Sequence, residues 1–178
     1  MNKSKRKNPA RTVALVGICA ASIECGKLAL MALPNIEVVS ILVAAFSYSF
    51  GYLGLCATVI FVLIEPMLFG FGTWVVSYLI YWPALSAVFI LLGRVRIKNR
   101  WLISGIAVFM TFLFGVISSL VDIGLFSGLY EDFFTRFFIY YVRGIPFYAL
   151  EIATNAVIFP TLFPLITSRM RMIGERLI

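Results

Sequence analysis

The basic residues of this chain are gathered in three short clusters that separate two long apolar stretches. Twelve of its fifteen Lys and Arg residues lie within residues 3–11, 94–100 and 169–176. Lipid solvates neither charges nor unpaired backbone groups, so a segment that crosses a membrane must be apolar and helical, while Lys and Arg are retained on the cytoplasmic side. The pattern therefore predicts a membrane-embedded helical bundle whose basic clusters lie at its cytoplasmic end.

The composition points the same way. Hydrophobic residues make up 62% of the chain and charged residues 13%, with a mean hydropathy of +1.01. In a typical soluble domain, charged residues make up about a quarter of the chain. We therefore expect one integral membrane domain over residues 1–178, without a separate soluble domain.

The first apolar stretch, residues 12–92, begins and ends beside a basic cluster, so it should cross the bilayer an even number of times. A crossing needs about twenty residues, and turn-forming residues interrupt the stretch at 34–35, 51–54 and 65–72. Four helices fit, at about 10–32, 36–51, 54–69 and 73–93. The second and third span only about 24 Å each, so we expect them where the protein or the bilayer is thin.

The second apolar stretch, residues 101–167, has one polar break at 127–136, which contains Glu131 and Asp132. Two further helices follow, at about 101–126 and 139–167. The sequence thus predicts an all-α membrane protein with six transmembrane helices and both termini in the cytoplasm.

The amino-terminal segment has the basic start and apolar continuation of a signal peptide. A cleaved signal, however, has a short apolar core and a small-residue cleavage site before a polar mature chain. Here the apolar run contains Glu24 and Lys27 and leads into more membrane-type sequence. We interpret it as a retained first helix whose basic tail contacts anionic lipid, and we do not expect nucleic-acid binding because no basic surface interleaved with aromatic residues follows.

Several kinds of chemistry lack their residues in this sequence. The chain has no histidine, its three cysteines show no metal-type spacing, and it contains no phosphate-binding Gly-x-x-x-x-Gly-Lys-Ser/Thr loop. We expect no metal, no cofactor and no enzymatic activity in this chain. If its function consumes ATP, partner subunits must hydrolyse the ATP.

Ionisable residues inside the apolar stretches are the main functional candidates, because each is costly in lipid unless it has a partner or faces a wet cavity. Glu24 and Lys27 lie three residues apart on one helical face, and they form either a structural pair or part of a site. Further candidates near the expected outer ends of the helices are Asn35, Glu37, Glu65, Trp74, Tyr78, Tyr81, Trp82, Asp122 and Arg143.

The last expected helix carries Gly144, Tyr148, Glu151 and Asn155 at spacings of four, three and four, which places them on one face. Together with the candidates above, they predict an outward-facing pocket with an aromatic wall. The alternative for the Trp and Tyr residues is a belt at the membrane interface. Acidic residues outnumber cations among these candidates, so we expect a ligand that bears amine or amide donors.

A stripe of small residues marks the first expected helix: Ala10, Ala14, Gly17 and Ala21, again spaced four, three and four. Small side chains let another helix approach closely in a membrane. The partner of this stripe is either another helix of the same bundle or a separate membrane subunit.

Three segments resemble the substrate-binding (S) components of energy-coupling factor transporters: residues 26–40 (GKLALMALPNIEVVS), residues 61–74 (FVLIEPMLFGFGTW) and residues 140–148 (YYVRGIPFY), with Asn155 beyond. The resemblance implies a six-helix protein of a bacterial or archaeal cell membrane that captures a micronutrient, such as a vitamin, from outside. It also implies that the protein associates with a transmembrane coupling (T) subunit and two ATPase subunits, and topples in the membrane to deliver the ligand.

The resemblance also implies roles for particular residues. The family's docking motif looks like Ala10 to Ala14 here, extended by Gly17 and Ala21. The family's ligand pockets correspond to Asn35, Glu37, Trp74, Tyr78, Arg143, Tyr148, Glu151 and Asn155. Relatives often carry Asp or His early in the last helix, where this chain has Tyr148 and Glu151, so the resemblance does not identify the micronutrient.

Two other classes of function stay open at this point. A stand-alone secondary carrier or channel would use the buried carboxylates as an ion path, although the two halves of the chain show no internal repeat of the kind many carriers have. An intramembrane enzyme would have to use Ser118 or Ser119 beside Asp122, and it would lack a histidine base.

Overall fold

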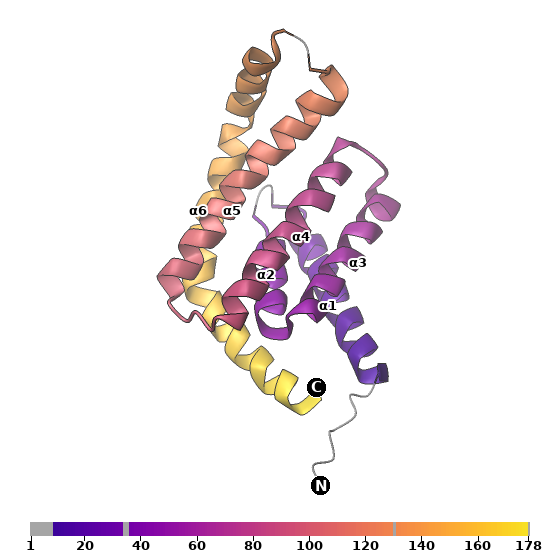
Figure 1. Ribbon diagram of the computed structural model, residues 1–178, viewed down its shortest axis with the longest axis vertical. Helices are drawn as coiled ribbons and strands as arrows, with labels where there is room; N and C mark the ends of the chain where they lie inside the picture. Colours follow the sequence, from indigo (N-terminus) through magenta and orange to yellow (C-terminus); the bar gives the residue numbers. More distant parts are fainter. Residues whose placement is uncertain (1–8, 34–35, 130, 178) are drawn as a thin grey trace.

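The computed structural model describes residues 9–33, 36–129 and 131–177, and within these every regular element is a helix. The elements, shown in Figure 1, are α1 (Pro9–Leu30), α2 (Val39–Phe50), α3 (Tyr52–Phe69), α4 (Thr73–Arg94), α5 (Arg100–Val121), the π-helix η1 (Asp122–Ser127) that continues α5, and α6 (Phe133–Leu177). The predicted all-α fold is confirmed.

Five of these helices are long and apolar enough to cross a membrane: α1, α3, α4, α5 with the start of η1, and α6. The remaining helix, α2, has 12 residues and a length of about 18 Å, well below the roughly 30 Å of a bilayer core. It begins three residues later than the sequence predicts, because residues 36–38 are not helical. The fold therefore has the character of a multi-pass membrane protein built around one short helix.

Protein rather than lipid covers the short helix α2. Nine of its twelve residues are buried, and α3, α4 and α6 pack around it. Glycines permit this close approach, since a Cβ on Gly54 would lie 2.5 Å from the backbone nitrogen of Ser47, and one on Gly93 would lie 2.3 Å from the carbonyl oxygen of Tyr48. Gly51, at a φ of 60°, reverses the chain between α2 and α3.

The last helix differs most from the prediction. Residues 139–167 were expected to be helical, whereas α6 runs from Phe133 to Leu177 and is about 68 Å long. Aromatic residues one turn apart, Phe133, Phe137 and Tyr141, stack at centroid distances of 6.4 and 6.0 Å and extend the helix at its start. The helix also continues through three prolines, as membrane helices often do.

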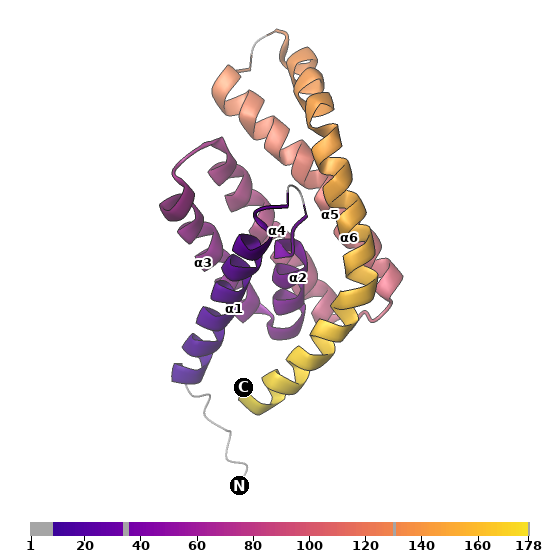
Figure 2. The same cartoon turned by 180° about the vertical axis from the view of Figure 1, so that it is seen from behind.

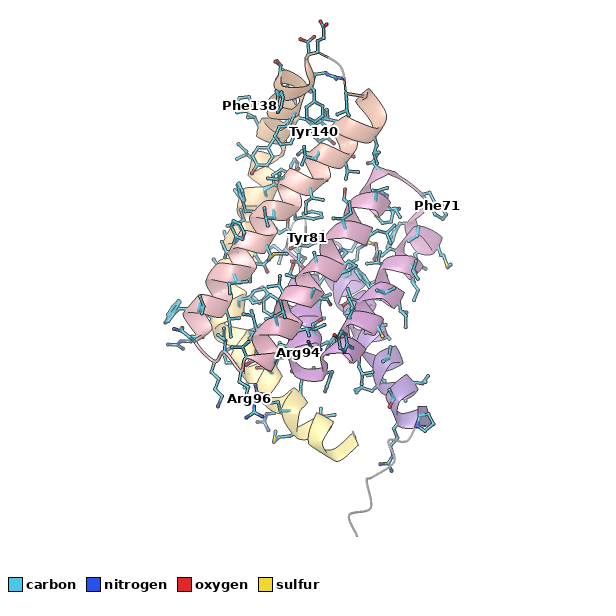
Figure 3. The ribbon with its side chains drawn as sticks, in the orientation of Figure 1. Phe71, Tyr81, Arg94, Arg96, Phe138 and Tyr140 are labelled. Atoms are coloured by element: carbon cyan, nitrogen blue, oxygen red, sulfur yellow. The ribbon has the colours of Figure 1, made fainter. Side chains whose placement is uncertain are left out.

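Basic and aromatic residues labelled in Figure 3 lie at opposite ends of the molecule. The first residues of α1, the connection from α4 to α5 and the last turns of α6 lie at one end, where Figure 3 labels Arg94 and Arg96. Phe71, between α3 and α4, lies toward the opposite end, and Phe138 and Tyr140 lie at its tip (Figure 3). We call these the basic end and the aromatic end. Figure 2 shows α1 on the outside of the bundle, where it packs on α3 and α2.

Candidate functional site

A cavity of about 190 Å³ lies where the start of α2 meets α1, α4, α5 and α6. Its lining residues are Lys27, Glu37, Val39, Tyr78, Trp82, Phe114 and Glu151. Besides Lys27, four of these, Glu37, Tyr78, Trp82 and Glu151, are candidates from the sequence, and they come from three segments far apart in the chain. The fold therefore brings part of the predicted pocket together, and we call this space the acidic cavity.

Glu37 is held in place by two hydrogen bonds. Its Oε2 accepts from the backbone N–H of Ser40 at 2.8 Å, in the first turn of α2, where the partial positive charge of a helix start favours a carboxylate. Its Oε1 accepts from Nδ2 of Asn155 at 3.3 Å. The same amide donates to Oγ1 of Thr111 on α5 at 3.0 Å. Asn155 is fully buried and so joins three segments behind the cavity.

Glu151 lies one turn before Asn155 on α6, and its side chain is 9% exposed. It lines the acidic cavity together with Glu37. The only ion pair among the described residues joins Lys27 to Glu65, so neither Glu37 nor Glu151 has a protein cation as a partner there. A buried carboxylate without a cation favours a ligand that donates hydrogen bonds or carries positive charge.

Lys27 has its charge compensated from α3. Its ammonium group forms an ion pair with the buried carboxylate of Glu65 and lies 4.4 Å from the ring centroid of Phe69. Glu24, the partner considered from the sequence, forms no salt bridge with Lys27 in the structure, and both its carboxylate oxygens are buried without a hydrogen bond to a described residue. The ion pair thus removes Lys27 as a counter-charge for Glu37 and Glu151.

An aromatic wall closes the acidic cavity on the side of α4 and α5. Tyr78 and Trp82 meet edge to face at a centroid distance of 5.6 Å, and Phe114 lies 6.3 Å from Tyr78. Such rings present both an apolar surface and negative faces that attract cations. The indole Nε1 of Trp82 and the amide Oδ1 of Asn155 are buried without a hydrogen-bond partner among the described residues. Buried polar atoms usually have partners, so these two mark positions that a ligand or water would satisfy.

Other predicted site residues lie outside this lining. Trp74 packs edge to face on Tyr78 at 5.2 Å, Asp122 accepts a hydrogen bond from Tyr140 at 2.8 Å, and Arg143 is exposed. Tyr148 stacks on Tyr141 at 5.6 Å, toward the aromatic end. Asn35 lies outside the described residues.

Sequence reasoning missed Thr111 and Phe114 on α5. They lie three residues apart and share a face of that helix, and both contact the site: Thr111 through Asn155, and Phe114 as a lining residue. The available signal was a hydroxyl one turn before a large ring on α5, a helix that also contains Ser104, Ser118 and Ser119. That signal is weak because such pairs are common in membrane helices.

The stripe of small residues on α1 lies away from the cavity. Ala10, Ala14, Gly17 and Ala21 are all exposed. No described atom outside the neighbouring backbone lies within 4 Å of the position where a Cβ on Gly17 would be. Gly17 is therefore not needed for packing within the described bundle, and it leaves room for another helix.

The fold and the cavity together define an all-helical protein of multi-pass membrane character with a buried acidic site. Comparisons of the chain with family models, with curated proteins and with solved structures gave no match.

Proposed function

We propose that this protein is the substrate-capture component of an energy-coupling factor transporter and binds a small micronutrient that carries amine or amide donors. The observation that carries the proposal is the acidic cavity, in which Glu37 and Glu151 face an aromatic wall without a protein cation of their own. A ligand with N–H donors would compensate these carboxylates, and a flat or cationic group would pack on Tyr78 and Trp82.

The cavity is built for recognition rather than for a reaction. Its carboxylate at residue 37 is fixed by the start of α2 and by Asn155, so little side-chain entropy is lost when a ligand binds. Among the described residues that line the cavity, none is a Ser, Thr or Cys that could act as a nucleophile. Capture without chemical change is the function that these side chains support best.

The exposed stripe on α1 supports the second half of the proposal. Small residues on an open face allow close helix packing in lipid, and this is the kind of surface that a transmembrane coupling subunit would use. Two ATPase subunits would supply the energy, since the chain has no phosphate-binding loop. The basic end would face the cytoplasm and the acidic cavity would open toward the exterior of a bacterial or archaeal cell.

The first test is to purify the protein from cells grown in rich medium and to identify co-purified small molecules by mass spectrometry. We expect a compound with amine or amide donors at about one per protein. The affinity of that compound should fall in Glu151→Gln and Asn155→Ala, and it should not change in Glu131→Gln, which removes an exposed carboxylate far from the cavity. Equal affinity in all four proteins would contradict the proposed site.

The second test separates capture from stand-alone transport. The alternative carrier would use the buried carboxylates Glu24 and Glu65 as an ion path. In proteoliposomes, the proposed component should accumulate its ligand only when the coupling and ATPase subunits and ATP are present. Accumulation by this chain alone, driven by an ion gradient, would favour the carrier and contradict the proposal.

A further inference from the structure

Two further cavities lie at the basic end, where α4 is connected to α5 and where α6 ends. One, of about 390 Å³, is lined by Tyr48, Ser49, Gly93, Arg96, Lys98 and Arg171. The other, of about 370 Å³, shares Tyr48, Lys98 and Arg171 with it and continues along Ile103, Phe163 and Pro164. Because they share three lining residues, the two cavities adjoin. We call them together the basic recess; it is polar in one half and mainly apolar in the other.

In the basic recess the guanidinium of Arg171 is held in position, and no described carboxylate neutralises the three cations. The guanidinium of Arg171 donates to Oη of Tyr48 at 3.1 Å and lies 5.4 Å from the centroid of that ring. Tyr48 in turn donates to the carbonyl oxygen of Ile97 at 2.7 Å. Among the described side chains, no carboxylate forms an ion pair with Arg96, Lys98 or Arg171.

The polar half also contains an unused hydroxyl and a constrained loop. Oγ of Ser49 is buried and has no hydrogen-bond partner among the described residues, although Ser49 lines this half. Arg96 has a φ of 57°, in the left-handed region that non-glycine residues seldom adopt. Its backbone is therefore fixed in the turn after α4, where Figure 3 labels it.

These groups match an anion with several oxygens, and the shape of the recess indicates which anion. Arg and Lys bind phosphate through charge-assisted hydrogen bonds, and Ser49 adds a donor beside them. A free phosphate would use only the polar half. A phospholipid would place its headgroup phosphate there and an acyl chain against Ile103 and Phe163, which line the apolar half.

We propose that the basic recess binds the headgroup of an anionic phospholipid, with Lys98 and Arg171 at the phosphate. The site joins α2, the α4–α5 connection and α6, so an occupied recess would tie together the three segments that meet at this end. Anionic lipids are abundant in the leaflet that basic clusters face, which makes them available to it. The proposal does not depend on the substrate-capture function, because it uses none of the residues of the acidic cavity.

The test compares lipids of equal chain length on the purified protein in a neutral detergent. Native mass spectrometry should show tighter binding of phosphatidylglycerol than of phosphatidylcholine. Lys98→Gln should reduce this preference about fivefold, as expected for one charge near a membrane surface, and the double variant with Arg171→Gln should reduce it further. Arg94→Gln is the matched control, because Arg94, the last residue of α4, is exposed and lines neither cavity.

Two results would overturn the proposal. The first is an equal loss of preference in Lys98→Gln and Arg94→Gln, which would mean diffuse attraction to the whole basic end. The second is that glycerol phosphate, which has no acyl chain, competes as strongly as phosphatidylglycerol, which would assign the recess to a free phosphate compound. The melting temperature of each variant without lipid checks that it is folded; because Lys98 is exposed, Lys98→Gln should melt like the unmodified protein.

Discussion

The acidic cavity and the basic recess are opposites built on the same short helix. The first turn of α2 fixes Glu37 through Ser40, and its last turns supply Tyr48 and Ser49 to the recess. In the acidic cavity, Glu37 and Glu151 have no described cation paired with them, since Lys27 is paired with Glu65, and in the basic recess no described carboxylate is paired with Lys98 or Arg171. The difference teaches that the lining side chains left without an ion pair among the described residues have opposite signs at the two sites, so each site favours a ligand of the opposite charge. Variants can be chosen that alter one of the two sites, both sites or neither.

The largest change in stability should follow the loss of the Lys27–Glu65 ion pair. This pair lies beside the acidic cavity and does not line the basic recess. Lys27→Met leaves the carboxylate of Glu65, which is 1% exposed, without its cation and should destabilise the protein by about 3 kcal/mol. Thermal unfolding in detergent measures this. The double variant Lys27→Met/Glu65→Gln should recover much of the loss, because position 65 then carries no buried charge without a cation. If the double variant is no more stable than Lys27→Met, Lys27 does not stabilise the protein through its ion pair with Glu65.

A change in the packing of α2 should affect both the acidic cavity and the basic recess. The Cβ of Gly54→Ala would lie 2.5 Å from the backbone nitrogen of Ser47, so α2 and α3 must move apart. We expect a loss of stability of about 2 kcal/mol and weaker binding at the acidic cavity and at the basic recess. Gly105→Ala, where nothing lies within 4 Å of the new Cβ, should be neutral or slightly stabilising. Equal melting temperatures for the two variants would contradict the close contact.

Removal of one charge should affect the acidic cavity and leave the basic recess unchanged. Glu151→Gln should lower the affinity for the co-purified ligand about tenfold, because it weakens a charge-assisted hydrogen bond. Isothermal titration calorimetry measures this affinity. The lipid preference of the same variant should equal that of the unmodified protein. If the lipid preference also falls, the acidic cavity and the basic recess are coupled.

The smallest effect on the isolated protein should come from a change in the stripe on α1, which lines neither the acidic cavity nor the basic recess. Gly17→Leu fills open space, so ligand affinity and lipid preference should not change. Its association with the coupling subunit should weaken about tenfold, measured by co-purification from membranes that contain both proteins. Gly105→Leu provides the control, since it also adds a side chain to an open and exposed position. Equal assembly of both variants would remove Gly17 from the docking face.

The helix limits could be predicted wherever the sequence carries its own punctuation. Gly51, the Gly70–Gly72 turn and the Arg94–Arg100 connection interrupt apolar runs, and the helices end within a few residues of them. The length of α6 could not be predicted in this way. The predicted helix, 139–167, was limited by the polar break at 127–136 and by the basic cluster at 169–176, and α6 extends into both.

The partners of the polar residues depended on three-dimensional packing. Lys27 pairs with Glu65, 38 residues away, and Asn155 donates to Thr111, 44 residues away. Nothing local fixes either pair, because each depends on how two helices are rotated against each other. The sequence could therefore indicate that Glu37, Tyr78 and Glu151 lie near one cavity, but it could not show that Lys27 is paired with Glu65.

The most direct test of the account is the affinity of the isolated protein for its co-purified ligand, measured in parallel for the unmodified chain, Glu151→Gln and Glu131→Gln. We predict that one ligand binds per protein, that Glu151→Gln weakens the binding about tenfold, and that Glu131→Gln leaves it unchanged. If Glu151→Gln binds as tightly as the unmodified chain, the acidic cavity is not the site of capture.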